Sequence, residues 1–124
     1  MEAKPSPSQV ARYANMLSAM GTIPRLRIMR QLLSAHPEGM VVGDIQSELD
    51  IPGSTLSHHL EKLKNVDLVT VRRERQFLWY AANADALREL LAFLYEECCT
   101  RSKAIRADSV VQLPPKTPSD VQDL

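Results

Sequence analysis

The chain has 124 residues, enough for one domain with a single core and too few for two domains of ordinary size. Hydrophobic residues make up 44% of it and aromatic residues only 5%, which favours packed helices over a β-sandwich. The formal net charge is zero, so a surface for nucleic acid would need a local concentration of cations. No apolar run approaches the roughly 18 residues of a membrane span, and the opening MEAKPSPSQV lacks the apolar core of a signal peptide. We therefore expect a cytoplasmic protein that does not enter a membrane.

Two helices are predicted in the first third of the chain. Residues 1–7 contain two prolines and are expected to form a disordered arm. In residues 8–20, apolar side chains recur at helical spacing, namely Val10, Tyr13, Ala14, Leu17 and Met20. The next helix has Thr22 as a candidate N-cap and Pro24 in its first turn, where a missing N–H does no harm. Its apolar side is Leu26, Ile28, Met29, Leu32 and Leu33, and the segment His36-Pro37-Glu38-Gly39 ends it.

Two short amphipathic helices follow, joined by a tight turn. The first is predicted from Val42 to Leu49, with its apolar residues facing inward, and the turn is Asp50-Ile51-Pro52-Gly53. Ser54 is expected to cap the second helix, whose apolar stripe has i, i+4, i+7 spacing and consists of Leu56, Leu60 and Leu63. Two such helices with a glycine-containing turn are typical of a helix-turn-helix.

After Asp67 the periodicity becomes that of strands. Residues 68–71 (LVTV) and 77–80 (FLWY) are rich in β-branched and aromatic side chains, and both are predicted strands. Between them, Arg72-Arg73-Glu74-Arg75-Gln76 is predicted to form a charged hairpin tip. A two-stranded hairpin is marginally stable alone, so this one must lean on the helices. Such a hairpin beside a helix-turn-helix is a wing.

A long helix is predicted from about Ala84 to Arg106, with Asn83 as N-cap and Asp85 at the positive end of the helix dipole. One apolar stripe runs along it and consists of Leu87, Leu90, Leu91, Leu94, Cys98 and Ile105. At 1.5 Å per residue the helix would be roughly 34 Å long, more than one small core can cover. We expect a homodimer in which this helix and the first one pack against the partner. The domain would span residues 8–106, and the proline-rich residues 107–124 would be a disordered tail.

The order helix, helix, helix-turn-helix, wing and long terminal helix resembles the ArsR/SmtB family of metal-responsive repressors over about residues 10–106. The most specific part is STLSHHLEKL at residues 54–63, which is similar to the family's recognition helix. Leu68-Val69, Arg73-Glu74 and Tyr80 resemble its wing, and PRLRI at 24–28 resembles the opening of its second helix. The resemblance implies a mainly α fold with a β-hairpin wing, a homodimeric winged helix-turn-helix that represses transcription and is not an enzyme.

The chain departs from the family pattern at several places. Asp67 stands where a glycine usually ends the recognition helix, and Arg75 where a glycine usually follows the acid of the wing tip. Asp67 tolerates a left-handed backbone less readily than glycine does, and the turn of the wing is expected to differ in shape from the family's. The family's cysteine pair before the helix-turn-helix would fall at Val41 and Gly43, and the histidines of its zinc site are missing near Leu87. Neither sensing site carries over, and no zinc is expected.

Candidate DNA contacts lie on the second helix of the helix-turn-helix and on the wing. Hydrogen-bonding side chains that face away from the leucine stripe suit base edges in a major groove, and these are Ser54, Thr55, Ser57 and His58. Cations suit phosphates, and these are Lys62, Lys64, Arg72, Arg73 and Arg75. His59 is expected to lean toward the core in a structural role. In a homodimer the two recognition helices would lie about one DNA turn apart, which predicts a palindromic operator.

Cys98 and Cys99 are the two cysteines of the chain and its candidate metal ligands. In a reducing compartment, adjacent cysteines are more often ligands or redox groups than a structural disulfide, although a buried cysteine can also be only a small hydrophobe. Neighbouring helical residues project about 100° apart, so Cys98 would lie on the apolar stripe and Cys99 beside it. Soft thiolates select thiophilic ions over hard cations.

The number of thiols favours a trivalent arsenical as effector. Tetrahedral zinc needs four ligands. Some ArsR relatives that resemble this chain have a cysteine pair late in the terminal helix and a third thiol about one or two turns later. This chain has Ile105 in that place. Arsenite favours three thiolates, whereas methylarsenite already carries one carbon and needs two.

We predict a repressor that leaves its operator when methylarsenite or arsenite binds Cys98 and Cys99, with trivalent antimony as a further candidate. A thiol-redox or persulfide-responsive repressor of the same fold is the alternative. A thiol-dependent enzyme is not expected, because the chain has no nucleophile loop, phosphate-binding glycine motif or base near the cysteines.

Overall fold

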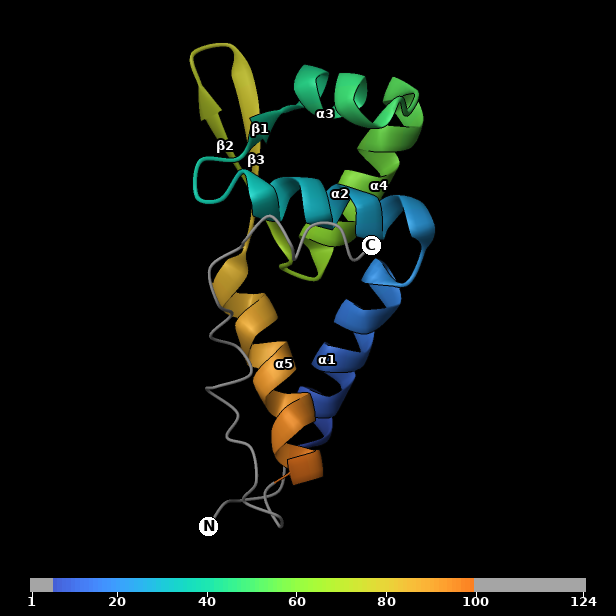
Figure 1. Ribbon diagram of the computed structural model, residues 1–124, viewed down its shortest axis with the longest axis vertical. Helices are drawn as coiled ribbons and strands as arrows, with labels where there is room; N and C mark the ends of the chain where they lie inside the picture. The colour runs from blue at the N-terminus through green and yellow to red at the C-terminus, as the bar shows by residue number, and fades with distance from the viewer. Residues whose placement is uncertain (1–5, 100–124) are drawn as a thin grey trace, which may run out of the picture. The chain divides into compact units, whose positions relative to one another are not determined.

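The computed structural model describes residues 6–99, with side chains described through Glu96. Its elements are α1 (Pro7–Met20), α2 (Ile23–Ser34), β1 (Met40–Val41), α3 (Val42–Leu49), α4 (Gly53–Asn65), β2 (Val69–Glu74), β3 (Phe77–Ala82) and α5 (Ala84–Cys99) (Figure 1). The chain divides after Leu87 into two compact units, so the first contains α1 to α4 and the sheet, and the second contains most of α5. The mainly helical fold with a β-hairpin wing is confirmed.

Capping residues set the starts of the first two helices. The Ser6 hydroxyl accepts a hydrogen bond from the Gln9 backbone N–H at 3.1 Å, and the Gln9 side chain accepts one from the Ser6 N–H at 3.0 Å. This capping box, with Pro7 in the first turn, starts α1 one residue before the predicted range, so Pro7 belongs to the helix and not to the arm. Thr22 caps α2 as predicted, because its hydroxyl accepts from the Arg25 N–H at 3.3 Å.

The helix-turn-helix is formed by α3 and α4. The bounds of α3 agree with the prediction, and Asp50 ends it in the left-handed conformation at φ 55°. The prediction that Ser54 caps α4 is wrong, because Pro52 is the N-cap and Ser54 is already the second helical residue. The carbonyl of Pro52 accepts from the Leu56 N–H at 2.8 Å, so helical hydrogen bonding begins before Ser54.

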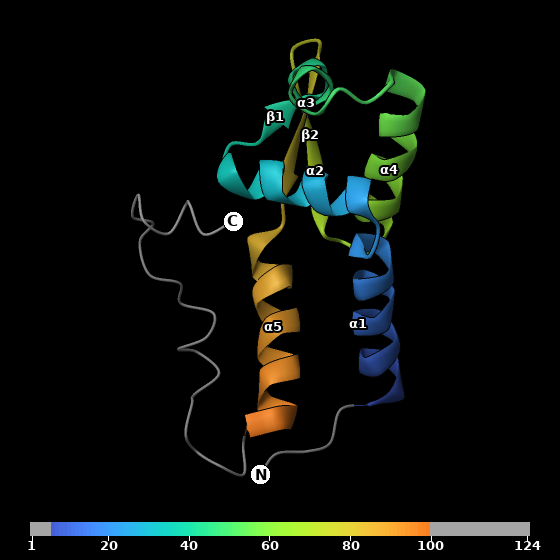
Figure 2. The same cartoon turned by 45° about the vertical axis from the view of Figure 1, so that its right-hand side comes forward.

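The core of the first unit lies between α1, α2, α3, α4 and the sheet. Helix α2 contacts α1, α3, α4 and β3, which places it at the centre of this unit (Figure 2). Ten apolar side chains of this core are less than 2% exposed, namely Met16, Ile28, Met29, Leu32, Ile45, Leu56, Leu60, Leu63, Leu68 and Val69. Burying each side chain of this size contributes roughly 1.5–3 kcal/mol. These contacts fix the orientation of α4 in the unit.

The sheet has three antiparallel strands in the order β1-β3-β2. Strand β1 is only two residues long and was not predicted, because two residues carry no readable period. The predicted wing tip is too long, because Arg72, Arg73 and Glu74 belong to strand β2. Glu74 pairs with Phe77, so only Arg75 and Gln76 form the turn, and Arg75 has φ 61°.

Helix α5 begins as predicted. The side-chain carbonyl of Asn83 accepts from the Ala86 N–H at 3.2 Å, and Asp85 lies in the first turn. The predicted continuation to Arg106 lies outside the described residues, as do residues 1–5 and the predicted tail. None of the described helices combines the length and low charge needed to cross a bilayer.

Candidate DNA-binding surface

One side of α4 is buried and the other faces outward. Leu56, Leu60 and Leu63 are at most 1% exposed, which holds the helix on the core at three successive points. All six predicted contacts on this helix are exposed, namely Ser54, Thr55, Ser57, His58, Lys62 and Lys64. The leucine spacing therefore determines which polar side chains the helix presents.

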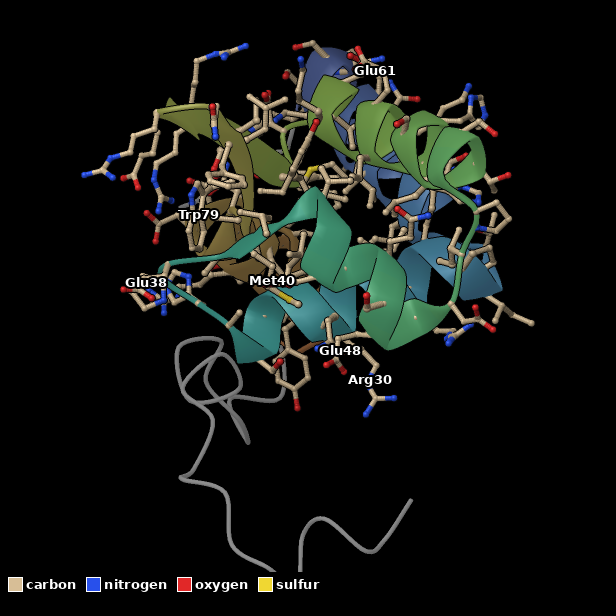
Figure 3. All side chains as sticks on the ribbon, turned by 90° about the horizontal axis from the view of Figure 1, so that it is seen from above. Arg30, Glu38, Met40, Glu48, Glu61 and Trp79 are labelled. Atoms are coloured by element: carbon tan, nitrogen blue, oxygen red, sulfur yellow. The ribbon has the colours of Figure 1, made fainter. Side chains whose placement is uncertain are left out.

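Glu61 is an acidic member of this outward face that the sequence reasoning did not include. It follows His58 by three residues and Ser57 by four, so the helical period already placed it there. Figure 3 shows it on the outer side of α4, on the opposite side of the unit from Arg30 and Glu48. Its carboxylate lies 3.9 Å from the Lys64 ammonium, and both side chains are exposed, so the pair adds little stability.

His59 turns away from this face and makes the predicted structural contact. Its Nδ1 accepts a hydrogen bond of 3.2 Å from Nε of Arg25. An acceptor Nδ1 requires a neutral imidazole with its proton on Nε2. Burial lowers the pKa of His59 below 6.5, and the positive charge of Arg25 and the neighbouring His58 lower it further.

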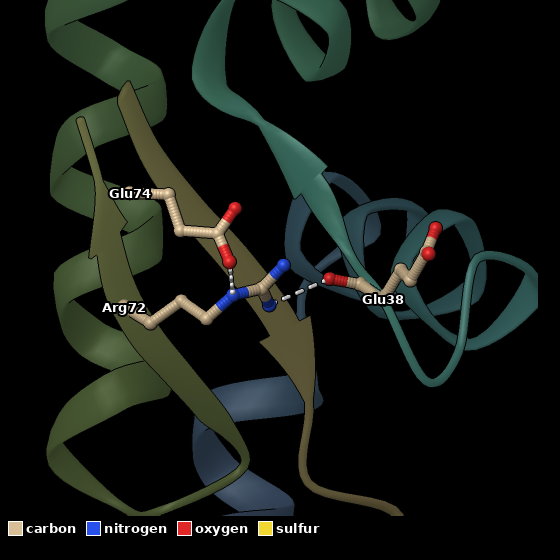
Figure 4. A network of polar contacts seen from close by, with 3 residues as sticks. All are labelled: Glu38, Arg72 and Glu74. Carbon is tan, nitrogen blue, oxygen red and sulfur yellow. Dashed lines mark hydrogen bonds and ion pairs between the residues drawn. The ribbon is translucent and has the colours of Figure 1, made fainter. Parts of the chain in front are cut away.

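The three arginines of the wing are not equivalent. All three are exposed. The Arg72 guanidinium donates from Nε to the Glu74 carboxylate at 3.2 Å and from Nη1 to the Glu38 carbonyl oxygen at 2.9 Å (Figure 4). It also lies 5.1 Å from the centre of the Trp79 ring, in a cation–π contact. No pattern along the chain indicates this network, because its members are brought together only by strand pairing and the loop before β1.

The predicted sensing residues are placed only in part. Cys98 and Cys99 are the last two described residues of α5, and their side chains, like Ile105, lie outside the description. In the described part of the chain, no group of three or more His, Cys, Asp or Glu side chains is arranged to hold a metal ion.

A helix-turn-helix with an outward polar face, followed by a hairpin with exposed cations, defines a winged helix-turn-helix DNA-binding domain. A family model described as a helix-turn-helix domain matches residues 25–72. This range contains most of α2, all of β1, α3 and α4, and the first four residues of β2.

Several known proteins are similar to the chain. Nodulation protein NolR of Rhizobium meliloti is 37% identical over 81 residues, which are 65% of this chain and 64% of NolR, just under two thirds of that protein. Transcriptional activator HlyU of Vibrio cholerae is 30% identical over 89 residues, covering 72% of this chain and 80% of HlyU. The HlyU structure matches with a TM-score of 0.60 over 76% of this chain and 99% of that one. An ArsR-like regulator from Rhodococcus sp. RHA1 shares the fold, with a TM-score of 0.68 at 16% identity over 87% and 99% of the two chains.

The chain belongs to the ArsR/SmtB family of winged helix-turn-helix transcriptional regulators. The proteins of this family are DNA-binding regulators and not enzymes.

Proposed function

We propose that the protein is a cytoplasmic, homodimeric repressor that binds a palindromic operator. The observation that carries this proposal is the pairing of an outward polar face on α4 with exposed arginines on the wing. HlyU is named an activator, so the direction of regulation is itself part of the proposal. We propose repression, in which the protein occupies its operator in the absence of effector.

The contacts divide by chemistry. Ser54, Thr55, Ser57 and His58 would meet base edges in the major groove. Lys62, Lys64, Arg73 and Arg75 would meet phosphates, which fix position and make affinity fall with salt. Arg72 was predicted among the phosphate contacts, but its guanidinium already has protein partners.

Exposed apolar side chains support the homodimer. On α1, Val10 is 49% exposed and Leu17 is 43% exposed, and their seven-residue spacing puts them on one side of the helix. On α5, Leu91 is 39% and Leu94 is 42% exposed, three residues apart. Apolar faces of this kind on two helices are typical of surfaces that a second subunit covers.

The proposed effector site is the pair Cys98 and Cys99. Position 98 follows Leu94 by four residues, so the sequence spacing carries the exposed leucine stripe toward the cysteines. Methylarsenite would exchange its two As–O bonds for two As–S bonds, and the two thiol protons would leave with the hydroxyls as two waters. Binding of the arsenical would distort this end of α5, alter the packing of the two subunits and so change the distance between their recognition helices. The coupling free energy between arsenical binding and DNA binding would be about 1–3 kcal/mol.

A thiol-redox response is the second candidate. It is favoured by a solved HlyU structure that is described as reduced, is 30% identical to this chain and has a TM-score of 0.58. In that case oxidation or persulfidation of the same two thiols would replace arsenic binding, and the wing and α4 would act as above.

Fluorescence anisotropy of a labelled duplex, selected by the protein from a random-sequence pool, tests both proposals. Methylarsenite and then arsenite should release the duplex at lower concentrations than zinc or cadmium, with antimonite as a further arm. The variant carrying Cys98→Ser and Cys99→Ser should bind the duplex as the wild type does and stay bound when arsenical is added. Release by peroxide or polysulfide but not by arsenicals would favour the redox candidate, and release of the double variant by arsenical would exclude this site.

A further inference from the structure

We propose that Arg72 is a positioning residue that holds the wing against the loop before β1, and that Arg73 and Arg75 supply the wing's phosphate contacts. This inference rests on the proposed DNA-binding function. The inference concerns how the wing is presented to DNA. A mobile hairpin would not keep its cations at fixed positions relative to the phosphates of the DNA backbone.

Arg72 extends from β2 across β3 to the loop that precedes β1. The register pairs Arg72 of β2 with Trp79 of β3, and Trp79 in turn with Val41 of β1. The side chain follows this line, because its guanidinium lies over the Trp79 ring and reaches the carbonyl of Glu38, two residues before β1 begins. A single side chain therefore connects β2 and β3 with the loop that leads into β1.

Glu74 fixes the direction of this side chain. It lies two residues further along β2, on the same side of the strand as Arg72. Its carboxylate accepts from Nε while the Glu38 carbonyl accepts from Nη1, so two different edges of the planar guanidinium are engaged (Figure 4). The nearby carboxylate also offsets the charge that a phosphate would attract.

The loop that receives this bond is itself held close to β3. Gly39 has φ 87°, and a Cβ there would lie 2.2 Å from the Tyr80 carbonyl oxygen. The backbone next to Glu38 therefore packs directly on the strand. A hydrogen bond from Arg72 to this point attaches β2 to a fixed part of the sheet.

Arg73 and Arg75 differ from Arg72 in their surroundings. Arg73 pairs with Leu78, so it projects from the opposite side of the sheet to Arg72 and Trp79. Arg75 is the first residue of the turn. Within residues 6–96 neither side chain has a hydrogen bond or ion pair to another residue, which leaves both guanidinium groups available for phosphate.

The salt dependence of DNA affinity separates a positioning residue from a phosphate ligand. The test compares Arg72→Lys and Arg72→Gln with the matched variant Arg73→Gln, using a fluorescein-labelled duplex selected from a random-sequence pool. We expect Arg73→Gln to reduce the slope of log K against log[KCl] by about one per subunit. Both Arg72 variants should keep the wild-type slope and lose affinity on the order of fivefold, the lysine included, because lysine cannot make both hydrogen bonds and the ring contact.

Amide hydrogen exchange in the protein without DNA gives the second measurement. The β2 and β3 amides should exchange faster in both Arg72 variants and at the wild-type rate in Arg73→Gln. The proposal would be overturned if wing exchange were unchanged in the Arg72 variants, or if Arg72→Gln lowered the slope and Arg72→Lys restored it. Absence of salt-dependent DNA binding by the wild type would instead refute the DNA-binding function, and the exchange rates would still decide whether Arg72 holds the wing.

Discussion

Arg25, near the start of α2, connects the recognition helix α4 to the end of α1. Its Nε donates to Nδ1 of His59 at 3.2 Å, and its Nη1 donates to the Ala19 carbonyl oxygen at 3.1 Å. One guanidinium thus joins three helices, among them α1, which carries part of the proposed dimer surface. A change at the subunit interface would have a direct path through Arg25 to the helix that faces DNA.

The first prediction concerns pH and His59. Its pKa is lowered in the folded protein, so the unfolded chain binds the proton more readily. The contribution of His59 to stability is therefore complete above pH 6.5 and is lost as the pH falls through its lowered pKa. Urea unfolding between pH 8 and pH 5 should show a smaller loss of stability on acidification in His59→Gln than in the wild type. His36→Gln, which changes an exposed histidine after the end of α2, is the control; an identical pH profile for His59→Gln and the wild type would contradict the prediction.

The second prediction concerns the loop before β1. Gly39→Ala would place a methyl group 2.2 Å from the Tyr80 oxygen at a φ of 87°, so either the loop or β3 must move. We expect a loss of about 2–4 kcal/mol in the free energy of unfolding, measured by denaturant titration. Gly43→Ala is the matched control, because its new Cβ would have no neighbour within 4 Å and alanine favours the helix. A smaller loss for Gly39→Ala than for Gly43→Ala would show that the close approach is not rigid.

A third prediction concerns Asp67, which has φ 65° after the end of α4. Its two contacts are made by backbone atoms, since its N–H donates to the Lys64 carbonyl and its carbonyl accepts from the Asn83 side chain. Asp67→Gly keeps both and removes the left-handed strain, so we expect a gain of about 0.5–1 kcal/mol after the entropy of the unfolded glycine is subtracted. Asp85→Gly, in the first turn of α5, should instead lose about that amount. Thermal unfolding of the two variants would show whether the signs are opposite.

The fourth prediction tests the dimer. Leu94→Glu places a charge among the exposed apolar residues of α5 and should weaken self-association on the order of 30-fold or more. Leu26 on α2 is also exposed, at 50%, and lies outside the proposed dimer surface, so Leu26→Glu is the control. Sedimentation equilibrium should find Leu26→Glu dimeric and Leu94→Glu largely monomeric. Equal association of both variants would place the subunit contact elsewhere.

Local features explain why several elements were predictable. Thr22 and Asn83 act as caps because a side chain accepts hydrogen bonds from backbone N–H groups only a few residues away. The apolar stripe of α4 is likewise a matter of residues three and four apart, and all three of its leucines are buried. The one wrong cap, Ser54, failed because Pro52 had already begun the helix two residues earlier.

The winged helix-turn-helix and the side of α4 that carries its polar residues follow from the order of amino acids alone, because helical period and capping are interactions between near neighbours in the chain. Tertiary structure alone decided the strand β1, the contact of Arg25 with His59 and the engagement of Arg72 by Glu38, Glu74 and Trp79. Arg72 and Glu38 are 34 residues apart, and so are Arg25 and His59. Partners at that separation meet only when the whole core has folded, so no local pattern distinguishes Arg72 from Arg73.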